Sequence, residues 1–309
     1  MQWHILGAGA IGLLWAAKFQ RTGFNTTLLL RNPAKLATYR GTFTIVESSI
    51  QESPTQKAQQ SSQIAVPAQA LDAPDCGLIH NLLITTKSYD SLSAFNSIRH
   101  RLADNARILL LHNGMGPQQA IAEQNPQLQV WAGSTTDGAY LNSAFELIRA
   151  GHGHTRIGRL NDPQDQSLSN QLISCEQALS HSPDIHATLW QKLAINCAIN
   201  PLTAIYQCRN GELSSHAEYR AHMQIICHEV EQVASHLQTP LFDQPLIDQA
   251  CLVAEQTANN YSSMYQDVIH QRRSEIETIT GYLCQQAAKH KIPVPENQRL
   301  YEQIIRLQA

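Results

Sequence analysis

The sequence predicts a two-domain α/β protein, with a doubly wound parallel sheet in residues 1–183 and an all-helical domain in residues 184–309. A glycine-rich turn joins a strand to a helix close to Met1, and apolar runs of strand length alternate with helical segments through the first half. After Pro183, strand signals become scarce and helix-periodic segments dominate. A chain of 309 residues is also long for one hydrophobic core, so two domains are expected.

The local patterns give approximate bounds for these elements. The expected strands are residues 3–6, 25–30, 78–86, 108–112 and 130–136, with short antiparallel strands in 140–158. The expected helices of the second domain are residues 187–199, 215–237, 243–258 and 275–290. Gly23 is expected to be the C-cap of the helix after the first strand. Residues 47–63 are rich in glutamine and serine, and we interpret them as a polar surface excursion with a structural role.

The glycine-rich turn has the spacing of a dinucleotide-binding loop, Gly7, Ala8, Gly9, Ala10, Ile11 and Gly12. The first glycine permits the tight turn, the second lets the backbone approach a pyrophosphate, and the third allows close packing of helix on strand. The N–H groups of the helix N-terminus then face the phosphates. The motif alone is weak evidence, but its place in an N-terminal βαβ unit favours a Rossmann-type cofactor site over a merely tight turn.

Arg31, at the end of the second strand, indicates which cofactor is bound. An acidic residue here would bind the ribose 2′-hydroxyl of NAD, whereas a guanidinium can bind the 2′-phosphate of NADPH. NADPH is therefore expected, and the alternative is a solvated surface arginine. Lys87 and Asn113 follow two other strands, at the edge of the sheet where ligands bind. Lys87 could equally be an ordinary surface lysine.

Two features of the second domain are candidates for the reaction site. Lys192, Asn196 and Asn200 are four residues apart and form a polar stripe on an otherwise apolar helix. Such a stripe meets solvent, a polar partner or a ligand, and the spacing does not decide between them. Ser274 is expected to cap the next helix, with Glu277 in a capping box. Glu275 could then simply favour the dipole of that helix.

Seven motifs along nearly the whole chain resemble those of the ketopantoate reductase family, and the stretch 47–63 departs from its pattern. They are residues 7–12, 112–116, 192–204, 210–213, 262–267, 275–276 and 293–297. The resemblance implies catalytic roles for Lys192 and Glu275, and substrate contacts from Lys192, Asn196, Asn200, Asn260 and Ser263. It implies cofactor contacts from residues 7–12, Arg31, Lys87, Asn113 and Glu275. The implied reaction is the NADPH-dependent reduction of 2-dehydropantoate to (R)-pantoate, in pantothenate and coenzyme A biosynthesis.

Composition argues against other classes of protein. A net charge of -3 and a pI near 6.5 do not favour nucleic-acid or membrane partners. Seven scattered cysteines without a CxxC pair, and the absence of a leader or a long apolar run, predict a cytoplasmic protein with reduced thiols. The histidines lack zinc-enzyme spacing, so no metal is expected. The expected partner is a small-molecule substrate, and the chain could be a monomer or a homodimer.

Two other functions remain open on the sequence alone. The first is a related NADP-dependent reductase of another 2-keto or 3-hydroxy acid, because a shared fold does not fix the substrate. The second is a non-catalytic dinucleotide-binding or redox-sensing protein, which would not need the polar stripe of the helical domain.

Overall fold

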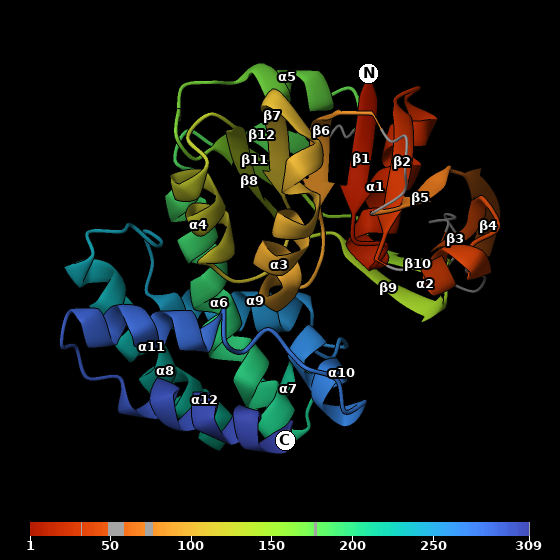
Figure 1. The fold of residues 1–309 in the computed structure, drawn as a ribbon. Coiled ribbons are helices and arrows are strands. Elements are labelled where there is room, and N and C mark those ends of the chain that lie inside the picture. The colour runs from red at the N-terminus through yellow and green to blue at the C-terminus, as the bar shows by residue number, and fades with distance from the viewer. Residues whose placement is uncertain (32, 49–58, 72–76, 176–177, 309) are drawn as a thin grey trace. The chain divides into compact units, whose positions relative to one another are not determined.

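The computed structural model describes residues 1–31, 33–48, 59–71, 77–175 and 178–308 (Figure 1). The chain divides into two compact units, of which the first comprises Met1–His112 and Pro117–Ile185 and the second Asn113–Gly116 and His186–Ala309. The short segment Asn113–Gly116 therefore belongs by its contacts to the second unit, although it lies between two parts of the first.

The first unit is built on an eight-stranded sheet with the order β12-β11-β8-β7-β6-β1-β2-β5. Its strands are β1 (Gln2–Leu6), β2 (Asn25–Leu30), β5 (Ala68–Ala70), β6 (Ile79–Ile84), β7 (Leu102–Leu110), β8 (Gln129–Thr135), β11 (Thr155–Arg159) and β12 (Leu179–His181). Neighbouring strands are parallel except β8 and β11. The predicted doubly wound sheet is thus confirmed. The strand order reverses between β1 and β6, and the carboxyl ends of the strands at such a switch point are where these sheets bind ligands.

Helices cover both faces of this sheet because side chains of successive strand residues point to opposite sides. On one face, Trp15 and Phe19 of α1 (Ala10–Arg21) are fully buried in a core that includes Phe43 and Leu147. These two come from a second, four-stranded sheet with the order β4-β3-β10-β9. Its strands are β3 (Thr42–Ser48), β4 (Gln59–Ala65), β9 (Gly138–Ser143) and β10 (Glu146–Gly151). On the other face, α3 (Ser88–Ile98) and α4 (Pro117–Gln124) complete a second core.

Two local predictions in this unit have different outcomes. The C-cap of α1 is Thr22, one residue before the expected Gly23; Gly23 follows it with a φ of +81° and donates its N–H to the carbonyl of Gln20 at 3.2 Å, so a glycine does terminate the helix. The polar excursion at 47–63 is wrong in part, because residues 47–48 belong to β3 and residues 59–63 belong to β4, which pairs antiparallel with β3. Backbone pairing at a sheet edge tolerates polar side chains on the exposed face, as where Gln63 donates to Thr44 Oγ1 at 2.7 Å. Residues 49–58 lie outside the described part of the chain.

The second unit is helical, as predicted. Its helices are α6 (Ile185–Tyr206), α7 (Glu212–Ser215), α8 (Ala217–His236), α9 (Leu246–Gln256), α10 (Ser263–Ile269), α11 (Thr280–Lys289) and α12 (Pro295–Leu307). Of these, α7, α10 and α12 were not among the expected helices. The end expected for the first of these helices is wrong, because α6 continues through Pro201 to Tyr206. Proline removes one backbone hydrogen bond, but Leu202 and Thr203 are fully buried, and tertiary packing outweighs the local cost.

The predicted start of the helix at 275 is also wrong. Residue 275 lies in a bend, residues 276–279 form turns, and α11 begins at Thr280. Ser274 does not cap that helix, whose N-cap is Ile279; instead, Gln308 Nε2 donates to its Oγ at 2.5 Å and Gln308 Oε1 accepts from its N–H at 3.2 Å. Glu277 pairs with Arg273. Within the described ranges, the helices are too short or too polar to traverse a bilayer.

Candidate functional site

The glycine loop has two positions where a side chain cannot fit and one that is open. Gly7 has a φ of +114°, and a Cβ there would lie 2.7 Å from the backbone N of Thr86. A Cβ at Gly12 would lie 1.9 Å from the carbonyl oxygen of Gly7. A Cβ at Gly9 would have no heavy atom within 4 Å. The first and third glycines therefore allow close packing, while the second leaves the backbone accessible to a ligand.

The start of α1 fits the pyrophosphate of a dinucleotide. Its N-cap is Gly9, and no side chain caps this end of the helix. First-turn N–H groups without a side-chain cap are suited to bind phosphate oxygens. Thr85, just after β6, donates its hydroxyl to the carbonyl of Gly7 at 2.7 Å and so links the two strand ends at the switch point. Ala8 is buried, and Ala10 and Ile11 are half-buried. Because all three side chains are apolar, the loop has no charge that would oppose a phosphate.

Two cations stand at the carboxyl ends of the strands that flank β1. Arg31 follows β2 and has a side chain that is 71% exposed, with Nη1 3.7 Å from Oδ2 of Asp90. An exposed pair at this distance contributes little, so the guanidinium can turn towards a phosphate. Lys87 is half-buried and is the N-cap residue of α3, three residues after the end of β6. The sheet therefore brings both predicted cofactor residues to the edge that carries the glycine loop.

In the second unit, Glu275 is held by the segment Asn113–Gly116. Glu275 is only 5% exposed, and Asn113 Nδ2 donates to its Oε2 at 3.0 Å. Met115 N–H donates to the carbonyl of Thr278 at 2.8 Å. A Cβ at Gly114 would lie 2.4 Å from Thr278 Oγ1, so only glycine allows this close approach. The sequence did not predict this contact, and Thr278 was not among the expected site residues.

Lys192, on α6, is electrostatically coupled to the same carboxylate. Burial lowers the pKa of Lys192 to about 8, and the negative charge of Glu275 acts in the opposite direction, raising it. An amine with this pKa is mostly protonated at neutral pH but gives up its proton more readily than an ordinary lysine. Lys192, Glu275 and Asn113 therefore form one cluster from three separate segments of the chain.

The remaining predicted substrate residues lie on α6 and on the segment before α10. On α6, Asn196 is half-buried and Asn200 is buried. Asn260 and Ser263 are exposed, and Ser263 is the first residue of α10. Their segment is tied to α6, because the hydroxyl of Thr203 lies 2.7 Å from the Oγ of Ser262. Ser262 in turn caps α10 by accepting from the N–H of Tyr265 at 3.0 Å.

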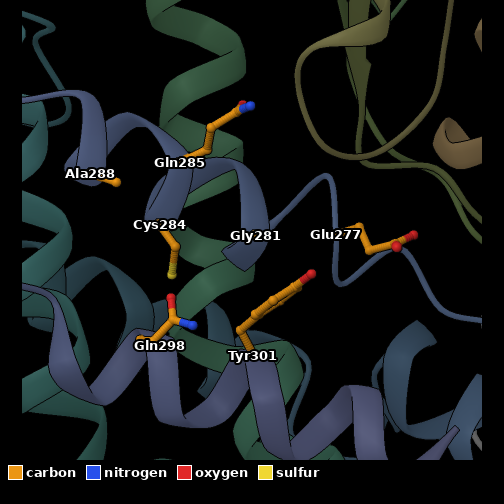
Figure 2. Close-up of a pocket in the computed structure, with 7 residues that line it drawn as sticks. All are labelled: Glu277, Gly281, Cys284, Gln285, Ala288, Gln298 and Tyr301. Carbon is orange, nitrogen blue, oxygen red and sulfur yellow. The ribbon is translucent and has the colours of Figure 1, made fainter. Parts of the chain in front are cut away.

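A groove of about 420 Å³ lies between α11 and α12 (Figure 2). Within the described part of the chain it is lined by Glu277, Gly281, Cys284, Gln285, Ala288, Gln298 and Tyr301, and none of these is a predicted site residue. Cys284 and Gln298 point towards each other from the two helices (Figure 2). Burial raises the pKa of the Cys284 thiol to about 12, so this sulfur is a poor nucleophile at neutral pH. In the same described part, no three His, Cys, Asp or Glu side chains are grouped to hold a metal ion.

Known proteins resemble this chain over its full length. A family model described as ketopantoate reductase PanE/ApbA matches residues 3–162, and the model of the C-terminal part of the same family matches residues 184–308. The 2-dehydropantoate 2-reductase of Vibrio cholerae is 33% identical over 304 residues, which cover 97% of this chain and 95% of that protein. The protein of the same name from Shigella flexneri is 34% identical, covering 100% and 96%.

Solved structures share the fold. The PanE/ApbA family ketopantoate reductase from Ralstonia eutropha is 24% identical, with a TM-score of 0.87 and coverage of 100% of this chain and 98% of that one. D-mandelate dehydrogenase, in a ternary structure with NADH and anilino(oxo)acetate, is 20% identical, with a TM-score of 0.88 and the same coverage. At these identities the likeness shows the fold alone. The family models and the full-length relatives above 30% identity show that this chain belongs to the ketopantoate reductase family.

Proposed function

We propose that this oxidoreductase reduces 2-dehydropantoate to (R)-pantoate with NADPH, the step that supplies pantoate for pantothenate and coenzyme A. The observation that carries the proposal is the cluster in which Lys192, with its lowered pKa, is coupled to Glu275, and Glu275 is bound by Asn113. Full-length relatives named for this reaction support the choice of substrate. In this proposal, residues 1–183 bind the cofactor, and residues 184–309 hold the substrate and the catalytic residues.

The proposed chemistry assigns the proton to Lys192. When bound, the reduced nicotinamide supplies the hydride that adds to the ketone carbon. The carbonyl oxygen becomes negative, and the ammonium of Lys192 stabilises this charge and donates the proton that completes the alcohol. A pKa of about 8 suits this role, because the amine starts protonated and can be reprotonated from water at neutral pH. Glu275 favours the protonated form, and Asn113 keeps its carboxylate in place.

Neutral side chains would orient the substrate. We propose that Asn196, Asn200, Asn260 and Ser263 bind its hydroxyl and carboxylate through hydrogen bonds. Fixing one face of the ketone in this way lowers the entropic part of the barrier and gives a single stereochemical product.

Cofactor choice is assigned to the first unit. The backbone at residues 7–12 would bind the pyrophosphate, Arg31 the 2′-phosphate, and Lys87 a further part of the dinucleotide. Asn113 and Glu275 would also contact the cofactor, as the family resemblance implies.

Turnover by the purified chain tests the proposal. NADPH oxidation is measured with 2-dehydropantoate, pyruvate and 2-ketoisovalerate for the wild type, for Lys192→Met and for Lys289→Met, a control at an exposed lysine of α11. The Lys192 variant should lose about 100-fold or more in kcat and still bind NADPH, by analogy with the loss of an oxyanion donor. Normal kcat in this variant would reject the role of Lys192. Preferred turnover of another acid would favour a related reductase, and NADPH binding without turnover would favour a non-catalytic protein.

We further propose a cytoplasmic location and a monomeric or homodimeric state. The support for the location is that, within the described residues, Cys197, Cys208, Cys227, Cys251 and Cys284 form no disulfide, as in a reducing compartment. Cell fractionation and light scattering test these two statements.

A further inference from the structure

The segment that carries Asn260 has no regular structure of its own. Residues 257–262, between α9 and α10, form turns and coil, and Asn259, Asn260 and Tyr261 are exposed. An exposed segment of this kind samples many conformations unless other parts of the protein restrain it. A side chain on it can bind a small substrate with defined geometry only if such restraints exist.

The backbone restraints come from residues 208–211, between α6 and α7. Asn210 N–H donates to the carbonyl of Asn260 at 3.0 Å, and Gly211 N–H donates to the carbonyl of Ala258 at 3.2 Å. Asn210 Nδ2 donates to Thr257 Oγ1 at 2.9 Å. The two segments therefore lie directly against each other and are paired at three points.

Arg209 adds contacts to both neighbours of Asn260. Its Nη1 donates to the carbonyl of Asn259, and its guanidinium carbon lies 4.5 Å from the ring centroid of Tyr261. The Arg209 N–H donates to Oε1 of Glu212 at 2.8 Å, which fixes the base of the side chain. A planar guanidinium can stack and donate at the same time, which an ammonium cannot do.

We propose that Arg209 is a positioning residue for substrate recognition, because it clamps the residues on either side of Asn260 and so fixes the orientation of the Asn260 side chain. This inference rests on the proposed function, in which Asn260 binds the substrate. Arg209 acts through Asn260 and not on the reacting atoms, so its loss should weaken binding of the substrate and leave the chemical step and the cofactor nearly unaffected.

Steady-state kinetics of four chains test the clamp. They are the wild type, Arg209→Ala, Arg209→Lys and the control Arg306→Ala, which removes an exposed arginine from α12. Arg209→Ala should raise the KM for 2-dehydropantoate about tenfold with little change in kcat or in the KM for NADPH. Arg209→Lys should recover only part of this loss, since it keeps the charge but not the stacked plane. The control should behave as the wild type.

Hydrogen exchange gives a readout that does not depend on turnover. The amides of Asn210 and Gly211, which donate to the clamped segment, should exchange faster in Arg209→Ala, while the core of α8 keeps its protection. The clamp is overturned if these amides exchange at the same rate in Arg209→Ala as in the wild type. It is also overturned if the variant lowers kcat and raises the KM values for 2-dehydropantoate and NADPH to the same extent. If Asn260→Ala raises the substrate KM and Arg209→Ala does not, the clamp is wrong and the proposed function stands. If the wild type does not turn over 2-dehydropantoate, the proposed function fails, and the role of Arg209 in recognition fails with it.

Discussion

The lowered pKa of Lys192 predicts a fall in activity at alkaline pH. With a pKa of about 8, the reactive ammonium form disappears above neutral pH. The protonated fraction falls from about 0.9 at pH 7 to about 0.1 at pH 9, so kcat/KM should fall by about tenfold if Lys192 is the acid. A lysine with the ordinary value of 10.5 would remain protonated over this range and give a nearly flat profile.

Glu275→Gln should move this alkaline limb to lower pH. The negative charge of Glu275 raises the pKa of Lys192, so a neutral amide in its place leaves burial less opposed and lowers that pKa further. Glu277→Gln is the matched control, because Glu277 is two residues away and pairs with Arg273. In Glu277→Gln, the alkaline limb should lie at the same pH as in the wild type.

The alkaline limb is measured from initial rates of NADPH oxidation between about pH 6 and about pH 10. The rates are analysed as kcat/KM, because the pH dependence of this ratio reports pKa values of the free enzyme. Each sample is returned to neutral pH to show that activity recovers. Lys192→Arg is a second check, since arginine remains charged throughout this range and its residual activity should have no limb. A flat wild-type profile, or a limb that is retained in Lys192→Arg, would refute the assignment of the proton donor.

Two further substitutions test the first unit. Arg31→Ala should raise the KM for NADPH and leave NADH use nearly unchanged, because only NADPH has a 2′-phosphate. The guanidinium is available for this phosphate because its contact with Asp90, at 3.7 Å, is weak. An equal loss of activity with both cofactors would speak against a phosphate contact. Lys18→Met leaves the carboxylate of Asp137 buried without its partner at 2.6 Å. The free energy of unfolding, measured by urea denaturation near pH 7, should fall by about 3 kcal/mol. Arg149, which remains 3.4 Å from Asp137, limits the loss. Burial acts to raise the pKa of Asp137, but its hydrogen bond and charge interaction with Lys18 help to lower it overall. The difference in the free energy of unfolding between variant and wild type should therefore shrink as acid protonates this carboxyl. A difference that stays constant with pH would contradict an ionic origin.

The sheet could be predicted from the sequence because its signals are local. Strand β2 was predicted with the bounds that it has, since its apolar end, Leu28 to Leu30, stops at the charged Arg31. The glycine loop was predictable for the same reason, because Gly7, Gly9 and Gly12 are close in sequence and each has a separate steric reason. Local spacing thus encodes the central strands of the first unit and the glycine loop, whereas β5 and β12 were not among the expected strands.

Features that depend on distant partners could not be predicted. The bond from Asn113 to Glu275 joins residues 162 positions apart, and no periodic pattern connects them. The same holds for Ser274, which looks like a helix cap in the sequence but is bound by Gln308, 34 positions later. In β4, backbone pairing with β3 outweighs a composition that is typical of loops.

The cluster of Lys192, Glu275 and Asn113 has a physical reason to act as one unit. A buried carboxylate is costly unless it is hydrogen-bonded and paired with an opposite charge, and Asn113 supplies the first while Lys192 supplies the second. The interaction with Glu275 in turn raises the pKa of Lys192 and so favours its protonated form at neutral pH. Removing any one of the three changes the environment of the other two, so their contributions to kcat cannot be added. The segment Asn113–Gly116 belongs by its contacts to the helical unit, and it supplies the carboxylate with a neutral hydrogen-bond donor.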